Sequence, residues 1–334
     1  MSAAFRLPAS DCDHGAPGLP KGVCYHFGVP PFEPAYLRLL TTGELRARAE
    51  AAREHLTACD LCARRCGVNR FEHLGFCRTG PLARVTSFGP HHGEEQPLRG
   101  CAGSGTVFFS RCNLRCIFCQ NHTISQRDTG QLMSDEELAG AFLSLQEEGC
   151  HNLNLVSPTH VIAAILPALV LAAEKGLRLP IVYNTGGYDS PEALELLDGV
   201  VDIYMPDMKY DDAAVSRRLS HAAVYPQANR EAVRVMHSQV GDLAVTDHGL
   251  AERGLLVRHL VLPGGLAGTE GIVRFLASEV SRETYLNLMD QYRPAYLARS
   301  HPLLRVPLPT REFQAAVEMA RRVGLHRLSS ITVP

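Results

Sequence analysis

Three cysteines near the middle of the chain carry its clearest chemical signal. Cys112, Cys116 and Cys119 follow one another with the spacing C-x3-C-x2-C. Three thiolates at this spacing can bind three irons of a [4Fe-4S] cluster and leave the fourth iron open to a small molecule. The alternatives are a zinc site, for which only His122 offers a nearby fourth ligand, and thiols that pack as small apolar side chains.

Four further cysteines precede this group, with the spacing C-x2-C-x3-C-x10-C. Thiolates so close along the chain can chelate a metal, although packed thiols are the alternative. The set suits a structural zinc ion or an auxiliary iron–sulfur cluster, and we favour the cluster slightly because the triad already predicts one in this protein. These four cysteines are Cys59, Cys62, Cys66 and Cys77. The isolated cysteines, which we expect to be unligated, are Cys12, Cys24, Cys101 and Cys150.

Polar residues also recur just after the strands that the pattern predicts. The Ser157-Pro-Thr159 run fits either a ligand contact or a helix cap, and Asn184 ends a strand ahead of two glycines. The Asp207-Met-Lys209 run and Arg258 fit either a ligand site at strand ends or ordinary ion pairs. Their recurrence after successive strands favours one shared site.

The elements that must position these residues alternate between strand and helix. Apolar runs at 106–110, 153–156, 180–183, 201–205, 255–262 and 285–289 predict strands, separated by helical segments. A capping box begins at Ser134, and a helix is expected over 42–57 with Thr42 as its N-cap. Such alternation predicts an α/β fold with a parallel sheet, and the cysteine loop follows the first core strand, at the end where α/β sheets bind ligands.

The bulk composition limits the classes of function. The chain has 334 residues with 46% hydrophobic content and a net charge of -2, which fits one large or two modest globular domains and gives no basic surplus for nucleic acid. It has neither a run of about 18 apolar residues nor a signal-like N-terminus, so we expect no membrane partner. Eleven cysteines in such a chain favour metal or redox chemistry in a reducing compartment, and therefore the cytoplasm.

The cysteine run, with the flanks Gly103-Ser-Gly-Thr-Val-Phe-Phe-Ser110 and Gln120-Asn121, resembles the signature of radical S-adenosylmethionine (SAM) enzymes. Within that superfamily it resembles the branch related to pyruvate formate-lyase activating enzyme, especially uncharacterised members with an extra four-cysteine motif. The resemblance extends from about residue 55 to about residue 295. It implies a partial, open (β/α)6 barrel, in which SAM binds the open iron and is cleaved by one electron to a 5′-deoxyadenosyl radical. We therefore expect an irregular extension over 1–40, a helix and metal-binding region over 41–95, and the barrel over 96–334.

The resemblance also implies roles and partners. Asp207 and Lys209 would lie beside the methionine end of SAM and Arg258 would approach it, with Asn184, Ser157 and Thr159 less directly involved. The chain departs from the branch because it lacks the Gly-Gly-Glu run that receives the SAM amino group after the second strand. The expected electron donor is a flavodoxin or a ferredoxin.

The expected reaction is hydrogen abstraction from a glycine of a glycyl radical protein. One alternative is radical modification of a small molecule or of another peptide residue. The alternative from another class is a non-enzymatic iron–sulfur or zinc protein that carries electrons or scaffolds partners.

Overall fold

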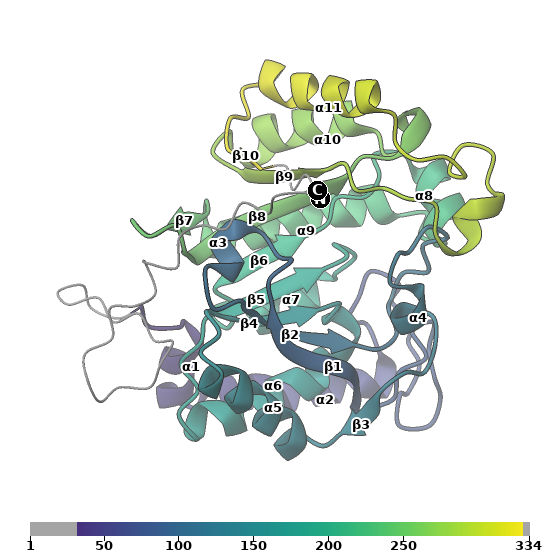
Figure 1. Cartoon of the computed structure of the whole chain (residues 1–334). Helices are drawn as coiled ribbons and strands as arrows, with labels where there is room; N and C mark the ends of the chain where they lie inside the picture. The colour runs from purple at the N-terminus through teal and green to yellow at the C-terminus, as the bar shows by residue number, and fades with distance from the viewer. Residues whose placement is uncertain (1–31, 330–334) are drawn as a thin grey trace, which may run out of the picture.

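The computed structural model describes residues 32–329. Their strands form one ten-stranded sheet in the order β10-β9-β8-β6-β5-β4-β2-β1-β3, with β7 paired to β8 (Figure 1). The strands are β1 Ala83–His91, β2 Ser104–Phe109, β3 Gln131–Met133, β4 Leu153–Val156, β5 Ile181–Thr185, β6 Ile203–Pro206, β7 Ala244–Val245, β8 Ala251–Leu260, β9 Tyr285–Met289 and β10 Leu328–Ser329.

The path from β2 through β4, β5, β6 and β8 to β9 is parallel throughout, and these are the six strands that the apolar runs predicted. The mixed α/β class with a large, mainly parallel sheet is therefore confirmed. An antiparallel addition was not anticipated: β1 pairs with β2 on one side and with β3 on the other. β1 was missed because its Gly89-Pro90 pair is typical of a turn and only two of its nine residues are buried.

Helices connect the strands and cover the sheet, with α10 and α11 at one end and α2, α5 and α6 at the other (Figure 1). The helices are α1 Tyr36–Thr42, α2 Glu44–Glu54, α3 Gln96–Arg99, α4 His122–Ser125, α5 Asp135–Glu147, α6 Ile162–Glu174, α7 Pro191–Leu197, α8 Ala213–Ser220, α9 Tyr225–Val240, α10 Thr269–Phe275 and α11 Thr310–Arg322. Short 3₁₀ turns occupy His55–Ala58, Thr159–Val161, Pro263–Gly265 and Tyr296–Ser300, and a π-turn, Leu276–Val280, extends α10. No helix within the described part of the chain is long and apolar enough to cross a bilayer.

Local sequence signals explain where two of these helices begin. The capping box is confirmed: Ser134 Oγ accepts from the Glu137 N–H over 3.2 Å, while the Glu137 carboxylate accepts from the Ser134 N–H over 2.8 Å. The predicted N-cap at Thr42 is wrong. Its hydroxyl donates backwards to the main-chain oxygen of Leu39, and Gly43, at φ 80°, separates α1 from α2. The single helix expected over 42–57 is thus the end of α1, then α2 and a 3₁₀ turn.

The two faces of the parallel strands have different roles. Leu155, Tyr183 and Val257 belong to the large core under the helices. Because side chains alternate along a strand, their neighbours Asn154, Asn184 and Arg258 face the inner, concave side. The base of that inner side is closed by a small apolar cluster that includes Leu98, Val182, Ile203, Met205 and Leu256. Polar side chains on the inner side therefore stand between an apolar base and the loops at the strand ends.

Candidate active site

The cysteine triad lies in the loop between β2 and α4, directly after the first parallel strand. Ser157 follows β4, Asn184 is the second-to-last residue of β5, and Asp207 follows β6. Since these strands are parallel neighbours, the residues that the sequence marked as separate signals come to the same edge of the sheet.

The three thiols share one electrostatic environment. Burial, together with the neighbouring Cys116 and Cys119 thiols, raises the pKa of Cys112 to about 12. Cys116 accepts a hydrogen bond from Ser220 Oγ over 2.9 Å, and the Cys119 sulfur lies 3.2 Å from Ser125 Oγ. Soft sulfur donors with hydroxyl partners suit an iron–sulfur cluster, whose thiolate ligands are commonly hydrogen-bonded in this way.

Lys209 links the thiols to the next group of charges. Burial alone would lower the pKa of its ammonium, but the attraction of Asp207, Cys116 and Cys112 raises the pKa instead. Its Nζ forms an ion pair with the Asp207 carboxylate. Lys209 therefore stays charged between the thiols and Asp207.

Arg258 continues this series of charges across the inner side of the sheet. Its Nε lies 3.0 Å from Glu95 Oε1 and its Nη1 lies 3.7 Å from Glu94 Oε2. Burial works to lower the pKa of the guanidinium, and Glu95, Glu94 and Asp207 raise it. Arg258 is thus paired with two acids.

Glu94 and Glu95 are residues that the sequence analysis missed. They precede α3, and the Glu95 side chain is fully buried at 0% exposure. Burial works to raise the pKa of Glu94, but His91 and Arg258 lower it. The only signal in the sequence was the run Gly93-Glu94-Glu95 between the strands β1 and β2. This run does not reveal that the loop folds inwards.

Several inner polar atoms have no hydrogen-bond partner among the described residues. Both amide atoms of Asn154 are buried without a hydrogen bond, as are Oε2 of Glu94 and Oε2 of Glu95. Asn287 donates to Glu95 Oε1 over 2.6 Å, while its own Oδ1 is unpartnered. Buried polar groups of folded proteins almost always have partners, so this side of the sheet is suited to a polar ligand.

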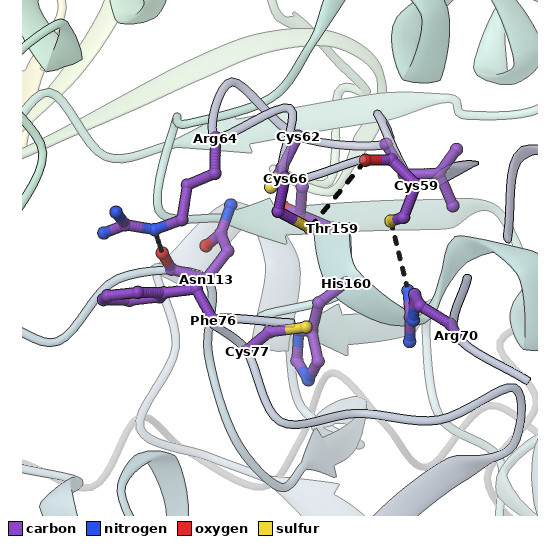
Figure 2. A pocket seen from close by; sticks show the side chains of 11 residues that line it. Cys59, Cys62, Arg64, Cys66, Arg70, Phe76, Cys77, Asn113, Thr159 and His160 are labelled. Atoms are coloured by element: carbon purple, nitrogen blue, oxygen red, sulfur yellow. Dashed lines mark hydrogen bonds between the residues drawn. The ribbon is translucent and has the colours of Figure 1, made fainter. Parts of the chain in front are cut away.

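The four N-terminal cysteines line a pocket together with Thr159 and His160 (Figure 2). Burial, together with the nearby Cys77, Cys59 and Cys66, raises the pKa of Cys62 to about 12. Nη1 of the buried Arg70 lies 3.9 Å from the Cys59 sulfur.

Across residues 32–329, no three Cys, His, Asp or Glu side chains are arranged around a single metal ion.

Thr159 lies by this pocket and not beside the triad. Its hydroxyl donates to Asp189 Oδ1 over 2.7 Å and lies 3.0 Å from Thr185 Oγ1. It forms no side-chain helix cap, and Ser157, at φ 57°, forms none either. The Ser157 N–H donates to the main-chain oxygen of Asn184, which joins the turns after β4 and β5.

The turn after β5 contacts both cysteine groups and Asp207. The carbonyl of Tyr188 accepts from Asn113 Nδ2 over 2.9 Å and from the Ala63 N–H over 3.3 Å. Gly187, at φ +70°, packs so closely that a Cβ would lie 2.2 Å from Asn229 Nδ2 and 2.4 Å from the Asp207 oxygen. Its glycine is therefore required by space as well as by conformation.

Comparison with known proteins agrees with this arrangement. The sequence model of the Radical SAM superfamily matches residues 106–247, which include the triad and the turns after β4, β5 and β6. The chain is 31% identical over 291 residues to the uncharacterised protein MJ0674 of Methanocaldococcus jannaschii, an alignment that covers 84% of this chain and 79% of that protein. The chain therefore belongs to the radical SAM superfamily.

Proposed function

We propose that Cys112, Cys116 and Cys119 hold the [4Fe-4S] cluster of this radical SAM enzyme and that SAM binds the open iron. The observation that carries the proposal is the gathering of these thiols beside Lys209 and Asp207 at the carboxyl ends of the parallel strands. Cluster and SAM, once bound, supply the radical that removes hydrogen from a substrate. The protein orients both and excludes water from the inner side of the sheet.

The test is release of 5′-deoxyadenosine from SAM by anaerobically reconstituted, chemically reduced protein. Cys116→Ala should abolish release, whereas Cys101→Ala, which changes an exposed thiol outside both groups, should retain it. Release at the parent rate from Cys116→Ala would contradict the triad assignment. No release from iron-loaded parent protein, with no effect of SAM on the cluster's EPR signal, would favour the non-enzymatic alternative.

We further propose that the methionine end of SAM is held by Lys209, Asp207 and Arg258, with Asn184 and Ser157 at the edge of the site. Arg258, which pairs with Glu95 through Nε and with Glu94 through Nη1, would bind the carboxylate of SAM. Thr159, whose hydroxyl donates to Asp189, would support the same edge of the site through this turn.

Glu94 is the best candidate for the carboxylate that the sequence lacks after β4. Its Oε2 is buried without a hydrogen bond and lies next to Arg258, and Asp207 acts on its charge. An ammonium group suits such an oxygen. Equilibrium binding of SAM to the cluster-loaded protein tests this: Glu94→Gln should weaken binding about tenfold, the effect of losing roughly 1.4 kcal/mol. Unchanged affinity would exclude Glu94.

The N-terminal cysteines, we propose, hold an auxiliary iron–sulfur cluster. Support comes from the four cysteines, which line one pocket, and from the Arg70 guanidinium, which lies 3.9 Å from the Cys59 sulfur. Iron and zinc analysis of a Cys112→Ala/Cys116→Ala/Cys119→Ala variant tests it. Retained iron with sulfide supports a cluster, whereas one zinc per chain contradicts it.

For the substrate, we propose a glycine of a glycyl radical protein, on the strength of the resemblance to activating enzymes. The alternatives are a small molecule or another peptide residue. A cytoplasmic extract labelled with deuterated glycine distinguishes them, because deuterium should pass from its protein fraction into 5′-deoxyadenosine. Transfer only from the small-molecule fraction would favour the alternative.

A further inference from the structure

A groove with a cavity of about 170 Å³ lies between the two cysteine groups. It touches Cys77 of the N-terminal group and Cys112 of the triad. The other residues that line it are Phe76, Arg78, Arg111, Arg115, Ser125, Gln126 and Tyr296. The groove adjoins α4, on the side of the molecule opposite α1 in Figure 1.

The groove carries a concentrated positive charge. Three arginines line it and no acidic residue does. Burial lowers the pKa of Arg115, and repulsion by Arg78 and Arg111 lowers it further. The nearby Asp128 forms an ion pair with Arg111 and so offsets one of the three charges. An incoming anion would relieve the remaining repulsion.

The arginines of the groove differ from two other arginines near the cysteines, whose side chains are used in contacts within the protein. Arg70 is buried beside Cys59, and Arg64 donates to main-chain carbonyls. Arg115 donates to the main-chain oxygen of Phe76 over 2.9 Å. Arg78 is exposed and forms no ion pair within the described residues, so its charge is directed at solvent.

The backbone of the groove is also unusual. Arg78, Arg111 and Tyr296 have left-handed φ angles of 52°, 72° and 50°. They make up half of the six non-glycine residues with positive φ in the described chain, and such conformations concentrate at functional sites. Packing of the two cysteine loops holds these residues in place despite the local cost.

We infer that this groove docks an acidic protein that donates single electrons to the cluster chemistry, an inference that rests on the proposed function. A radical SAM enzyme needs a reductant, and charge complementarity selects an acidic one. One electron leaves the reduced donor, which is oxidised by one equivalent, and enters the enzyme's iron–sulfur centre, which is reduced by one equivalent. No bond or proton is exchanged. Because Cys112 and Cys77 line the groove, a partner seated there stands directly over both cysteine groups.

The experiment compares two donors by anaerobic stopped-flow absorbance of the reconstituted full-length protein. Reduced bacterial flavodoxin is the acidic protein donor, and reduced methyl viologen is a small cationic donor that bypasses docking. Arg78→Glu should slow reduction by flavodoxin about tenfold, the lower end of electrostatic steering, and leave reduction by methyl viologen unchanged. The parent rate with flavodoxin should also fall as salt is raised.

Two matched variants complete the test. Arg78→Lys retains the charge and should retain the parent rate, whereas Arg38→Glu makes the same charge change on an exposed residue of α1 and should have no effect. Equal losses in Arg78→Glu and Arg38→Glu, or a rate indifferent to salt, would overturn the inference. An equal loss with methyl viologen would also overturn it, since Arg78 would then act on the cluster itself. Failure of the proposed function looks different: parent protein reduced by methyl viologen would release no 5′-deoxyadenosine.

Discussion

The guanidinium of Arg64, two residues after Cys62, donates from Nε to the main-chain oxygen of Asn113, the residue after Cys112, over 2.5 Å. The same group donates to the main-chain oxygens of His221 over 2.8 Å and Ser220 over 3.2 Å. Its Cζ lies 3.4 Å from the centre of the Phe76 ring. One side chain thus fastens the N-terminal cysteine loop to the triad loop and to the end of α8.

Replacing Arg64 should loosen both cysteine loops together. Arg64→Ala removes three charge-assisted hydrogen bonds and leaves buried carbonyls unsatisfied, so we expect a loss of about 2–3 kcal/mol in the free energy of unfolding. Denaturant unfolding of the apoprotein measures the loss. Arg65→Ala, which removes a more exposed ion pair with Glu192, should cost less than about 1 kcal/mol. Equal effects of the two changes would show that Arg64 does not join the loops.

The hydrogen bond from Ser220 to Cys116 should tune the redox potential of the triad site. A donor to a ligating sulfur stabilises the reduced, more negative cluster, so Ser220→Ala should shift the potential to more negative values. EPR-monitored potentiometry measures the shift. Ser216→Ala is the matched control, because Ser216 is a buried serine of the same helix whose hydroxyl donates to Ala213. A redox potential that is unchanged in Ser220→Ala would contradict the assignment of Cys116 as a cluster ligand.

Arg258 should be important for stability as well as for the ligand. Arg258→Met leaves Glu94 and Glu95 buried without their cation, for which we expect a loss of about 3–5 kcal/mol in the free energy of unfolding. The added change Glu95→Gln removes one of the unpaired charges and should restore part of the loss. If the double variant is less stable than Arg258→Met, the two ion pairs are not the cause.

Asp202 should make the stability of the apoprotein depend on pH. Its carboxylate accepts from the N–H groups of Ala35 and Ile181, each over 2.9 Å, yet burial raises its pKa from 3.8 to about 6. Between these values the native state binds a proton that the unfolded chain has released, so the free energy of unfolding falls as the pH rises through this interval. Across the whole interval, the free energy of unfolding should fall by about 3 kcal/mol.

Chemical unfolding at about pH 4.5 and about pH 7.5 measures the effect of Asp202. Asp202→Asn has no charge to release, so its stability should fall less than that of the parent between the two conditions. A parent and variant that respond identically would show that Asp202 titrates alike in both states.

The sequence predicted the parts of the fold that local patterns determine. Six apolar runs gave the six parallel strands, and the Ser134–Glu137 pair gave the start of α5. Because parallel strands end at one edge, strand order alone brought the triad, Asn184 and Asp207 together.

What the sequence did not reveal depends on contacts between distant segments. Glu94 and Glu95 resemble surface acids until the loop before α3 folds against β8 and pairs them with Arg258. Thr42 is a residue type that is common at N-caps, but its hydroxyl donates to the main-chain oxygen of Leu39 in α1, the helix that Thr42 ends. β1 is a strand because it pairs with the edge of β2. Its own residues, most of which are at least partly exposed, do not indicate this pairing.

The close packing of Gly187 also has a consequence for sequence variation. At Gly186 a Cβ would press on the Leu114 side chain, at 3.1 Å, which can move aside, and would touch Lys209 Cε at an ordinary 3.8 Å. At Gly187 it would strike the Asp207 carbonyl and the Asn229 amide. Among descendants of a common ancestor that keep this turn, alanine or serine should therefore replace the first glycine of the pair from time to time and the second almost never.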